Sequence, residues 1–134
     1  MTDAGRVGIV LVSHSAALAA GTAELAGQVS GGEVVIVPAG GTDDGRLGTS
    51  IDKVRHALAA ADSGAGVVVL PDLGSSVLTV RALLADGDGL PEPLAVADAP
   101  FVEGAVAATI AAAVGGDIKA VASAAEEARH VRKL

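Results

Sequence analysis

His14 is the residue whose type and position most strongly suggest chemistry. It lies between Ser13 and Ser15, directly after the apolar run at residues 7–12 and before a segment with helical spacing. A neutral imidazole has one basic nitrogen that can act as a nucleophile, a base or a ligand. The N–H groups of the following helix would face an anion beside the ring. From spacing alone, it is an equally good interpretation that His14 lies near a helix start and makes only a structural hydrogen bond.

Asp72 is the carboxylate best placed to pair with His14, because it closely follows the apolar run at residues 66–70. A carboxylate bound to one ring N–H fixes the tautomer and raises the basicity of the other nitrogen. The alternative is a turn or cap residue. In an open parallel sheet, functional residues gather at the carboxyl ends of the strands. The segments that follow the four apolar runs would share that rim, namely residues 13–15, 38–45, 71–76 and 98–100.

Other familiar sites are poorly supported. Residues 40–47 resemble half of a P-loop but lack its Lys-Ser/Thr pair, and no G-x-G-x-x-G or G-x-S-x-G motif is present. The chain has no cysteine, and its three histidines lack metal-ligand spacing. We therefore expect no metal and no cofactor. His56 should be solvated opposite an apolar helix stripe, and His130 lies among basic residues near the C-terminus.

The elements that must position these residues are visible as four short apolar runs, at residues 7–12, 34–37, 66–70 and 94–97. Continuous, Val-rich runs are typical of parallel strands buried on both faces. Helical spacing between them predicts three helices. The first spans residues 16–30, with Leu18, Leu25 and Val29 on one side. The second begins at residue 51, and the third begins after Ser75 or Ser76, either of which could be its N-cap. This alternation predicts βαβ units with helices on both faces of the sheet.

Two more helices are predicted at about residues 102–114 and 118–131. The first is apolar nearly all round, which indicates burial on more than one side. A second subunit is the simplest cover for it in so small a chain, so we expect a homodimer.

Composition narrows the function classes further. The 134 residues suggest one domain spanning 1–134, and the 51% hydrophobic content argues against disorder. The net charge of −7 and the 1% aromatic content disfavour nucleic acid as a partner. No stretch is suited to span a bilayer, and the first residues lack a signal-peptide pattern. We expect a cytoplasmic protein without membrane insertion.

Four ordered motifs together resemble the mannose-type enzyme IIA domains, in the branch that donates phosphoryl groups within phosphotransferase-system-dependent dihydroxyacetone kinases. The motifs are GIVLVSHS at 8–15, AGGTDDG with GTS at 39–45 and 48–50, DLGS at 72–75, and APFVEGA at 99–105. The resemblance covers about residues 6–128. The loop at 39–50 points to the dihydroxyacetone kinase branch rather than the sugar-transport branch. Ser76, where a small apolar residue is expected, and Pro71 depart from the family pattern.

The resemblance implies an open, mostly parallel four-stranded α/β sheet with helices on both faces and one extra antiparallel strand, in a homodimer. It implies that His14 accepts a phosphoryl group from HPr, supplied in trans, and passes it to ADP on the nucleotide-binding kinase subunit. Asp72 would orient His14, and Ser15, Gly41, Thr42 and Ser75 would support the phosphoryl group. Arg46 would lie near the interface with the partner.

Two other functions share this fold. An enzyme IIA of a mannose-type sugar transporter would use the same chemistry with a IIB domain as acceptor. A non-catalytic regulatory homologue would have lost transfer, which the presence of both His14 and Asp72 disfavours.

Overall fold

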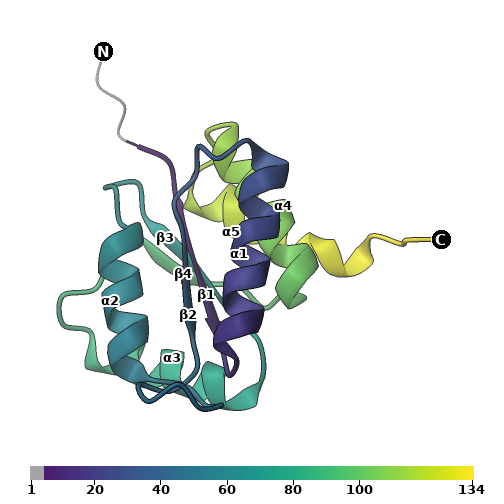
Figure 1. The fold of residues 1–134 in the computed structure, drawn as a ribbon. Coiled ribbons are helices and arrows are strands. Elements are labelled where there is room, and N and C mark those ends of the chain that lie inside the picture. The colour runs from purple at the N-terminus through teal and green to yellow at the C-terminus, as the bar shows by residue number, and fades with distance from the viewer. Residues whose placement is uncertain (1–4) are drawn as a thin grey trace.

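The computed structural model describes residues 5–134, which form four parallel strands alternating with helices (Figure 1). The strands lie in the order β2-β1-β3-β4. They are β1 (Gly8–Ser13), β2 (Ile36–Gly40), β3 (Val67–Pro71) and β4 (Leu94–Val96). The helices are α1 (Ala16–Ser30), α2 (Ile51–Ala61), α3 (Gly74–Asp86), α4 (Phe101–Ala113) and α5 (Ile118–Glu127), followed by a 3-10 turn at Ala128–His130. The predicted α/β class and parallel sheet are confirmed.

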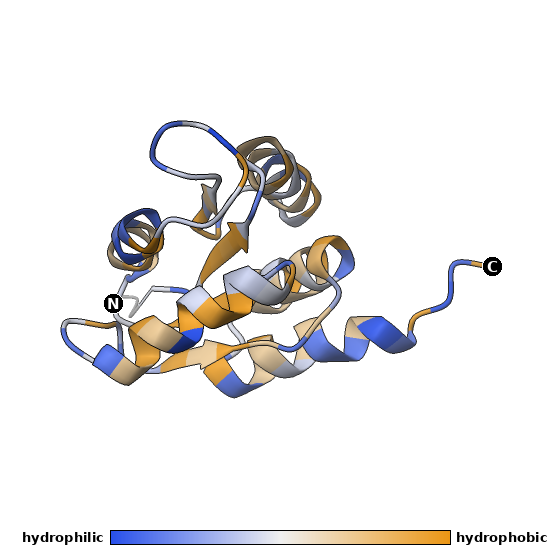
Figure 2. Cartoon of the chain, turned by 90° about the horizontal axis from the view of Figure 1, so that it is seen from below, coloured by the Kyte–Doolittle hydropathy of each residue, from blue (hydrophilic) through white to orange (hydrophobic). Residues whose placement is uncertain are grey.

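The sheet separates two apolar cores, because successive side chains of a strand point to opposite faces. Ile9 and Leu11 of β1 pack in the core shared with α1, α4 and α5, whereas Val10 and Val12 pack in the core shared with α2 and α3. Figure 1 shows the two groups of helices on either side of the sheet, and Figure 2 shows apolar strands between helices that carry polar positions. Burial on both faces explains why the strands are continuous apolar runs.

The inner face of α1 is made of small residues. Ala19, Thr22 and Ala26 are buried, while the predicted stripe of Leu18, Leu25 and Val29 lies on the outer side and is 41–53% exposed. Small inward side chains let α1 pack closely on β2 and α4. The spacing of large apolar residues therefore marked the exposed side of this helix.

Several boundaries differ from the sequence prediction. Strand β2 begins at Ile36, two residues later than its apolar run, and α5 ends at Glu127. Helix α3 begins at Gly74, with Leu73 as N-cap and no side-chain cap bond, so neither Ser75 nor Ser76 caps it. Within residues 5–134 the sheet has four strands, and the extra antiparallel strand is absent because the chain passes from β4 into α4 after a short turn.

Much of the apolar surface of α4 is covered within the chain itself. Its buried residues include Gly104, Ala105, Ala108 and Ala112, which face α1, α5 and the sheet. The prediction that a second subunit covers this helix therefore concerns only its remaining outer side. Within residues 5–134, no helix combines the length and apolar character needed to cross a membrane.

Candidate active site

His14 and Asp72 meet at the carboxyl ends of the two central strands. The chain leaves β1 toward β2 on one side and later returns to form β3 on the other, so their carboxyl ends flank a topological switch point. His14 directly follows β1, and Asp72 directly follows β3. The Asp72 N–H donates to the carbonyl of Val12 at 2.9 Å, which extends the pairing of the strands to the site.

Five hydrogen bonds converge on the Asp72 carboxylate, whose side chain is only 6% exposed. Oδ1 accepts from His14 Nδ1 at 3.0 Å, from the Ser76 hydroxyl at 2.7 Å and from the Leu73 N–H at 2.6 Å. Oδ2 accepts from the Ser13 hydroxyl at 2.8 Å and from the His14 backbone N–H at 3.1 Å. Ser13 and Ser76 are fully buried, so their hydroxyls are committed to this cluster.

This environment keeps Asp72 ionised. Burial by itself raises the pKa of Asp72, but hydrogen bonds, led by those from the Ser76 hydroxyl and the His14 N–H, lower it to about 2. An ionised carboxylate can only accept hydrogen bonds, so His14 Nδ1 must carry the proton that it shares with Asp72. The basic lone pair of the neutral ring is therefore on Nε2.

Nε2 faces the rim, where the Ser75 hydroxyl lies in hydrogen-bond contact with it. Because this nitrogen has no proton in that tautomer, Ser75 is the donor. The His14 side chain is 28% exposed, so an incoming group can reach it once Ser75 turns away. The arrangement provides a nucleophilic nitrogen with a fixed tautomer and a hydroxyl beside it.

Helices α1 and α3 both begin close to His14. Ser15 caps α1 by accepting from the Leu18 N–H at 3.1 Å, and α3 begins at Gly74 without a side-chain cap. The first N–H groups of a helix have no partner within the helix, and its amino end carries a partial positive charge. The site can therefore accommodate negative oxygens beside Nε2. The Ser15 hydroxyl itself is used as the cap.

The loop at residues 41–50 closes the other side of the site. The Gly48 N–H donates to the His14 carbonyl at 2.9 Å, and the Gly41 N–H donates to the Ser13 carbonyl at 3.1 Å. At Gly40, where the loop leaves β2, a Cβ would lie 2.4 Å from the Ser15 carbonyl oxygen, so only glycine permits this close approach.

Thr42 and Arg46 are used inside this loop. The Thr42 hydroxyl accepts from the Arg46 N–H at 3.0 Å and also bonds Asp44, while the Arg46 guanidinium pairs with Asp44 at 2.6 Å. Within residues 5–134, no hydrogen bond joins Thr42 to His14. The structure thus brings His14, Asp72 and Ser75 together, places Ser15 and Gly41 in the supporting backbone, and leaves Thr42 further out.

Sequence analysis gave the hydroxyls of Ser13, Ser76 and Thr49 no role in the site. Ser76 was considered only as a possible helix N-cap and as a departure from the family pattern, yet it bonds both Asp72 and, at 3.2 Å, Thr49. A polar residue that ends a wholly buried strand, as Ser13 does, is the signal that could have identified one of them.

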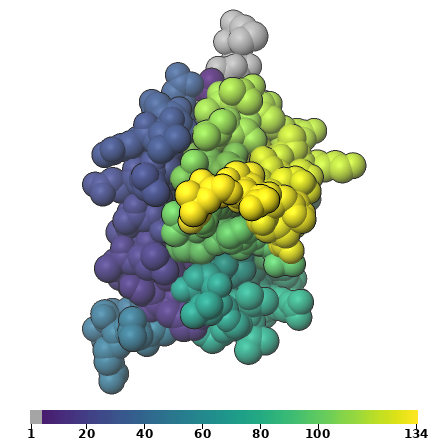
Figure 3. Space-filling model, turned by 90° about the vertical axis from the view of Figure 1, so that its right-hand side faces the viewer, coloured from purple at the N-terminus to yellow at the C-terminus, as the bar shows by residue number. Residues whose placement is uncertain are grey.

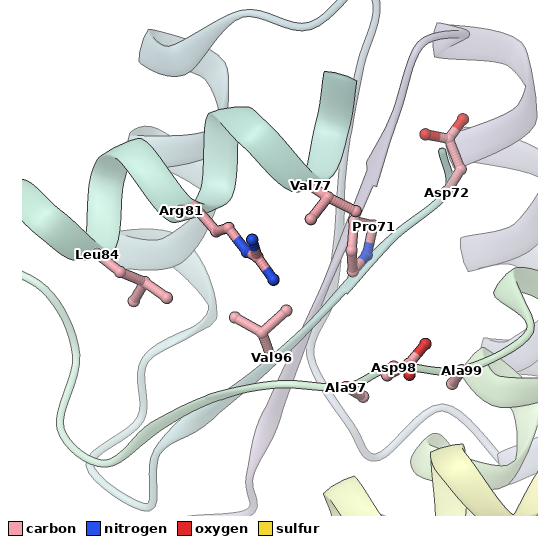
Figure 4. Close-up of a pocket in the computed structure, with 9 residues that line it drawn as sticks. All are labelled: Pro71, Asp72, Val77, Arg81, Leu84, Val96, Ala97, Asp98 and Ala99. Atoms are coloured by element: carbon pink, nitrogen blue, oxygen red, sulfur yellow. The ribbon is translucent and has the colours of Figure 1, made fainter. Parts of the chain in front are cut away.

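A cleft of about 460 Å³ lies next to the site, between α3 and the ends of β3 and β4. Figure 4 shows the Arg81 guanidinium pointing into it, with Pro71 and Asp72 at one end and Val96 across from it. His14 is not among the residues that line this cleft. His14 therefore lies on the rim beside the cleft and not inside it.

Replacing Asp72 should reduce stability in a pH-dependent way. The pKa of Asp72 is about 2 in the folded protein, against 3.8 for the group in the unfolded chain. This difference adds about 2 kcal/mol to the free energy of unfolding at pH values above 3.8, and the contribution is lost as the pH falls through the folded pKa. We expect Asp72→Asn to be less stable than the wild type at pH 7 by at least this amount. The gap, measured by urea unfolding, should shrink between about pH 4 and pH 2.

Asp98→Asn is the matched control for this experiment, because the Asp98 carboxylate is 95% exposed. Its stability difference from the wild type should be small at every pH. A gap for Asp72→Asn that stays constant from pH 7 to pH 2 would contradict the assigned hydrogen-bond cluster.

Comparison with known proteins identifies the family of this chain. Residues 8–122 match the family model described as PTS system fructose IIA component, EIIA-man. A crystal structure titled as that of an unknown-function protein, EF1359, superposes with a TM-score of 0.80 at 34% identity, covering 91% of this chain and 94% of that one.

Several similar proteins are named DhaM, phosphoryl donor subunit of a PEP-dependent dihydroxyacetone kinase. That of Listeria innocua (kinase 2) is 34% identical, covering 86% of this chain and 93% of its own length. Those of Providencia stuartii and Escherichia coli K12 are 35% and 37% identical over 95% and 86% of this chain. The chain spans only 28% and 25% of these two longer relatives. The chain therefore belongs to the mannose-type enzyme IIA family, in its branch of DhaM phosphoryl donor subunits of dihydroxyacetone kinase.

Proposed function

We propose that this chain is a phosphohistidine carrier, in which Nε2 of His14 accepts a phosphoryl group from HPr and passes it to ADP on the nucleotide-binding subunit of dihydroxyacetone kinase. The observation that carries the proposal is the hydrogen bond between His14 Nδ1 and the ionised Asp72, which leaves Nε2 as the basic nitrogen at the rim. The relatives named as phosphoryl donor subunits support the same reaction class. The chain would then act as a phosphotransferase within a larger kinase.

In the first step, the Nε2 lone pair attacks phosphorus as the bond between phosphorus and HPr breaks. The proton on Nδ1 stays in place, and the Asp72 charge stabilises the positive charge that develops on the ring. Ser75 turns its hydroxyl from Nε2 toward a phosphoryl oxygen, and the first N–H groups of α1 and α3 face the other oxygens. Positioning and charge stabilisation are the main requirements of phosphoryl transfer.

In the second step, a terminal oxygen of ADP attacks the same phosphorus atom and the Nε2–P bond breaks. The electron pair returns to Nε2, and the ring is neutral again with its proton on Nδ1. ATP then phosphorylates dihydroxyacetone elsewhere in the complex. The rim position of His14 suits both steps, because two different proteins must reach the same nitrogen.

His14 should be the only residue that becomes phosphorylated. Incubation with phosphoenolpyruvate, enzyme I and HPr should add one acid-labile phosphoryl group, detected as a mass gain. His14→Ala should abolish labelling, whereas His56→Ala and His130→Ala should keep it, since these rings lie outside the Asp72 cluster. Phosphorus-31 NMR should place the group on Nε2. Labelling that survives in His14→Ala would refute the proposal.

The acceptor distinguishes this function from that of a sugar-transport enzyme IIA. Phosphorylated protein is mixed with the ADP-loaded kinase subunit of a DhaM-dependent system and, separately, with a mannose-type IIB domain. We expect rapid discharge with formation of ATP in the first mixture only. Discharge by the IIB domain alone would assign the chain to sugar transport. Discharge by neither, with His14 readily labelled, would favour a regulatory role.

We also propose that the chain forms a homodimer through the outer side of its late helices. Leu25, Ile110 and Val131 are 44–74% exposed and line an apolar groove of about 520 Å³ between α1, α4 and the C-terminal segment. Figure 3 shows this face, with the C-terminal segment in yellow in front of α4 in green, and Figure 1 shows that the last residues project away from the helices. Contiguous exposed apolar surface of this kind marks an interaction site.

Light scattering at micromolar concentration should therefore give twice the 12.9 kDa mass of one chain. Ile110→Glu should shift the population toward monomer by placing a charge in the apolar groove, while Leu78→Glu, on the exposed side of α3, should not. A wild-type mass of about one chain would end this proposal.

A further inference from the structure

We propose that Thr49 and Ser76 are positioning residues whose hydroxyls set how strongly Asp72 binds the ring of His14, and thereby balance uptake of the phosphoryl group against its release. This inference rests on the proposed function and adds two residues to it. It starts from hydroxyls that the reaction described above does not use.

The direction of the hydrogen bonds follows from the charge on Asp72. The Ser76 hydroxyl has one proton, and Asp72 Oδ1, 2.7 Å away, can only accept it. In the 3.2 Å contact between Ser76 and Thr49, Thr49 must therefore be the donor. Protons thus point from Thr49 to Ser76 to Asp72. Hydrogen bonds in such a chain strengthen one another.

Ser76 also touches the histidine itself. Its Oγ lies 3.3 Å from Nδ1, while Asp72 Oδ1 lies 3.0 Å from the same nitrogen. The ring proton is therefore shared between a charged and a neutral acceptor. Ser76 is fully buried, so water cannot replace its hydroxyl without rearrangement of the site.

Thr49 connects this cluster to the loop at residues 41–50. It forms a parallel bridge with Gly41, and the neighbouring Gly48 N–H holds the His14 carbonyl at 2.9 Å. The same loop thus contacts the backbone of His14 directly and its ring through Thr49, Ser76 and Asp72. Within residues 5–134, the one other hydroxyl that bonds this carboxylate is that of Ser13, which donates to it directly.

The effect on phosphoryl transfer follows from where positive charge resides. With phosphorus on Nε2 and a proton on Nδ1, the ring is cationic, so it is stabilised more than the neutral ring by a strongly basic carboxylate. Donors to Oδ1 disperse the carboxylate charge and weaken that stabilisation. Ser76, with Thr49 behind it, therefore destabilises the phosphorylated form and favours release to the acceptor.

The test is the equilibrium distribution of phosphoryl groups between HPr and this chain, measured by native mass spectrometry. Ser76→Ala should shift it toward the phosphorylated chain by about three- to tenfold, the size expected if losing one donor changes the carboxylate's proton affinity by about half to one pH unit. Thr49→Val should shift the distribution about twofold in the same direction. Thr49→Ser keeps the hydroxyl and should therefore give the wild-type distribution.

The double variant should show no larger shift than Ser76→Ala, because the influence of Thr49 passes through Ser76. Thr109→Val is the matched control, since it removes a buried hydroxyl bonded only to the Ala105 carbonyl within α4. An unchanged distribution in both Ser76→Ala and Thr49→Val, or additive shifts in the double variant, would overturn the proposal. If Ser76→Ala does not fold, the two Thr49 variants decide the matter alone.

A second readout is independent of HPr. In the unphosphorylated protein, the proton NMR signal of the His14 Nδ1–H should move downfield in Ser76→Ala and, less, in Thr49→Val, because Oδ1 becomes a stronger acceptor. If the wild type takes no phosphoryl group from HPr, the proposed function fails while this signal still tests the two hydroxyls. An unmoved signal in both variants would refute their role.

Discussion

The buried charge of Asp72 is the constraint on which the site depends. A carboxylate placed at the end of a buried strand would become protonated or solvated unless hydrogen-bond donors replaced water. Here the donors come from the end of β1, from the backbone and ring of His14, and from the start of α3. Each donor reaches the Asp72 carboxylate only when its backbone segment has one particular conformation. The same interactions that keep Asp72 charged therefore hold the histidine in one tautomer and one orientation.

The sheet order explains how so many groups reach one carboxylate. Strand β1 is central, with β2 and β3 as its neighbours, and Val12 is paired with Ala39 on one side and Pro71 on the other. The loops that leave these three strands consequently start side by side. His14 receives contacts from both sides, from Gly48 in the loop after β2 and from Asp72 and the first turn of α3, Ser75 and Ser76, after β3.

The sequence predicted what depends on regular periodicity and missed what depends on single contacts. Val-rich runs located all four strands because both faces of the sheet are covered, and the helix at 16–30 matched α1. The outward side of α1 was not foreseeable, since its inner face is built from Ala19 and Ala26, which carry little hydropathic signal in so Ala-rich a chain. The roles of Ser76 and Thr49 were equally hidden, whereas Ser13 carried a signal as the polar end of a buried strand. For Ser76 and Thr49, only the three-dimensional position of the hydroxyl gives it a partner.

A carrier has to satisfy two opposing demands at one nitrogen. A carboxylate that bound the ring as strongly as possible would make Nε2 a good nucleophile, but it would also stabilise the phosphorylated ring and slow its discharge. A carboxylate that is saturated with donors, as Asp72 is, stays charged and orients the ring while much of its basicity is already satisfied. A site that only has to stabilise one transition state gains from maximal stabilisation, whereas a site that must both accept and release a group gains from moderation. For the proposed carrier function, the donors on Asp72 would tune the phosphorylated intermediate as well as hold the site together.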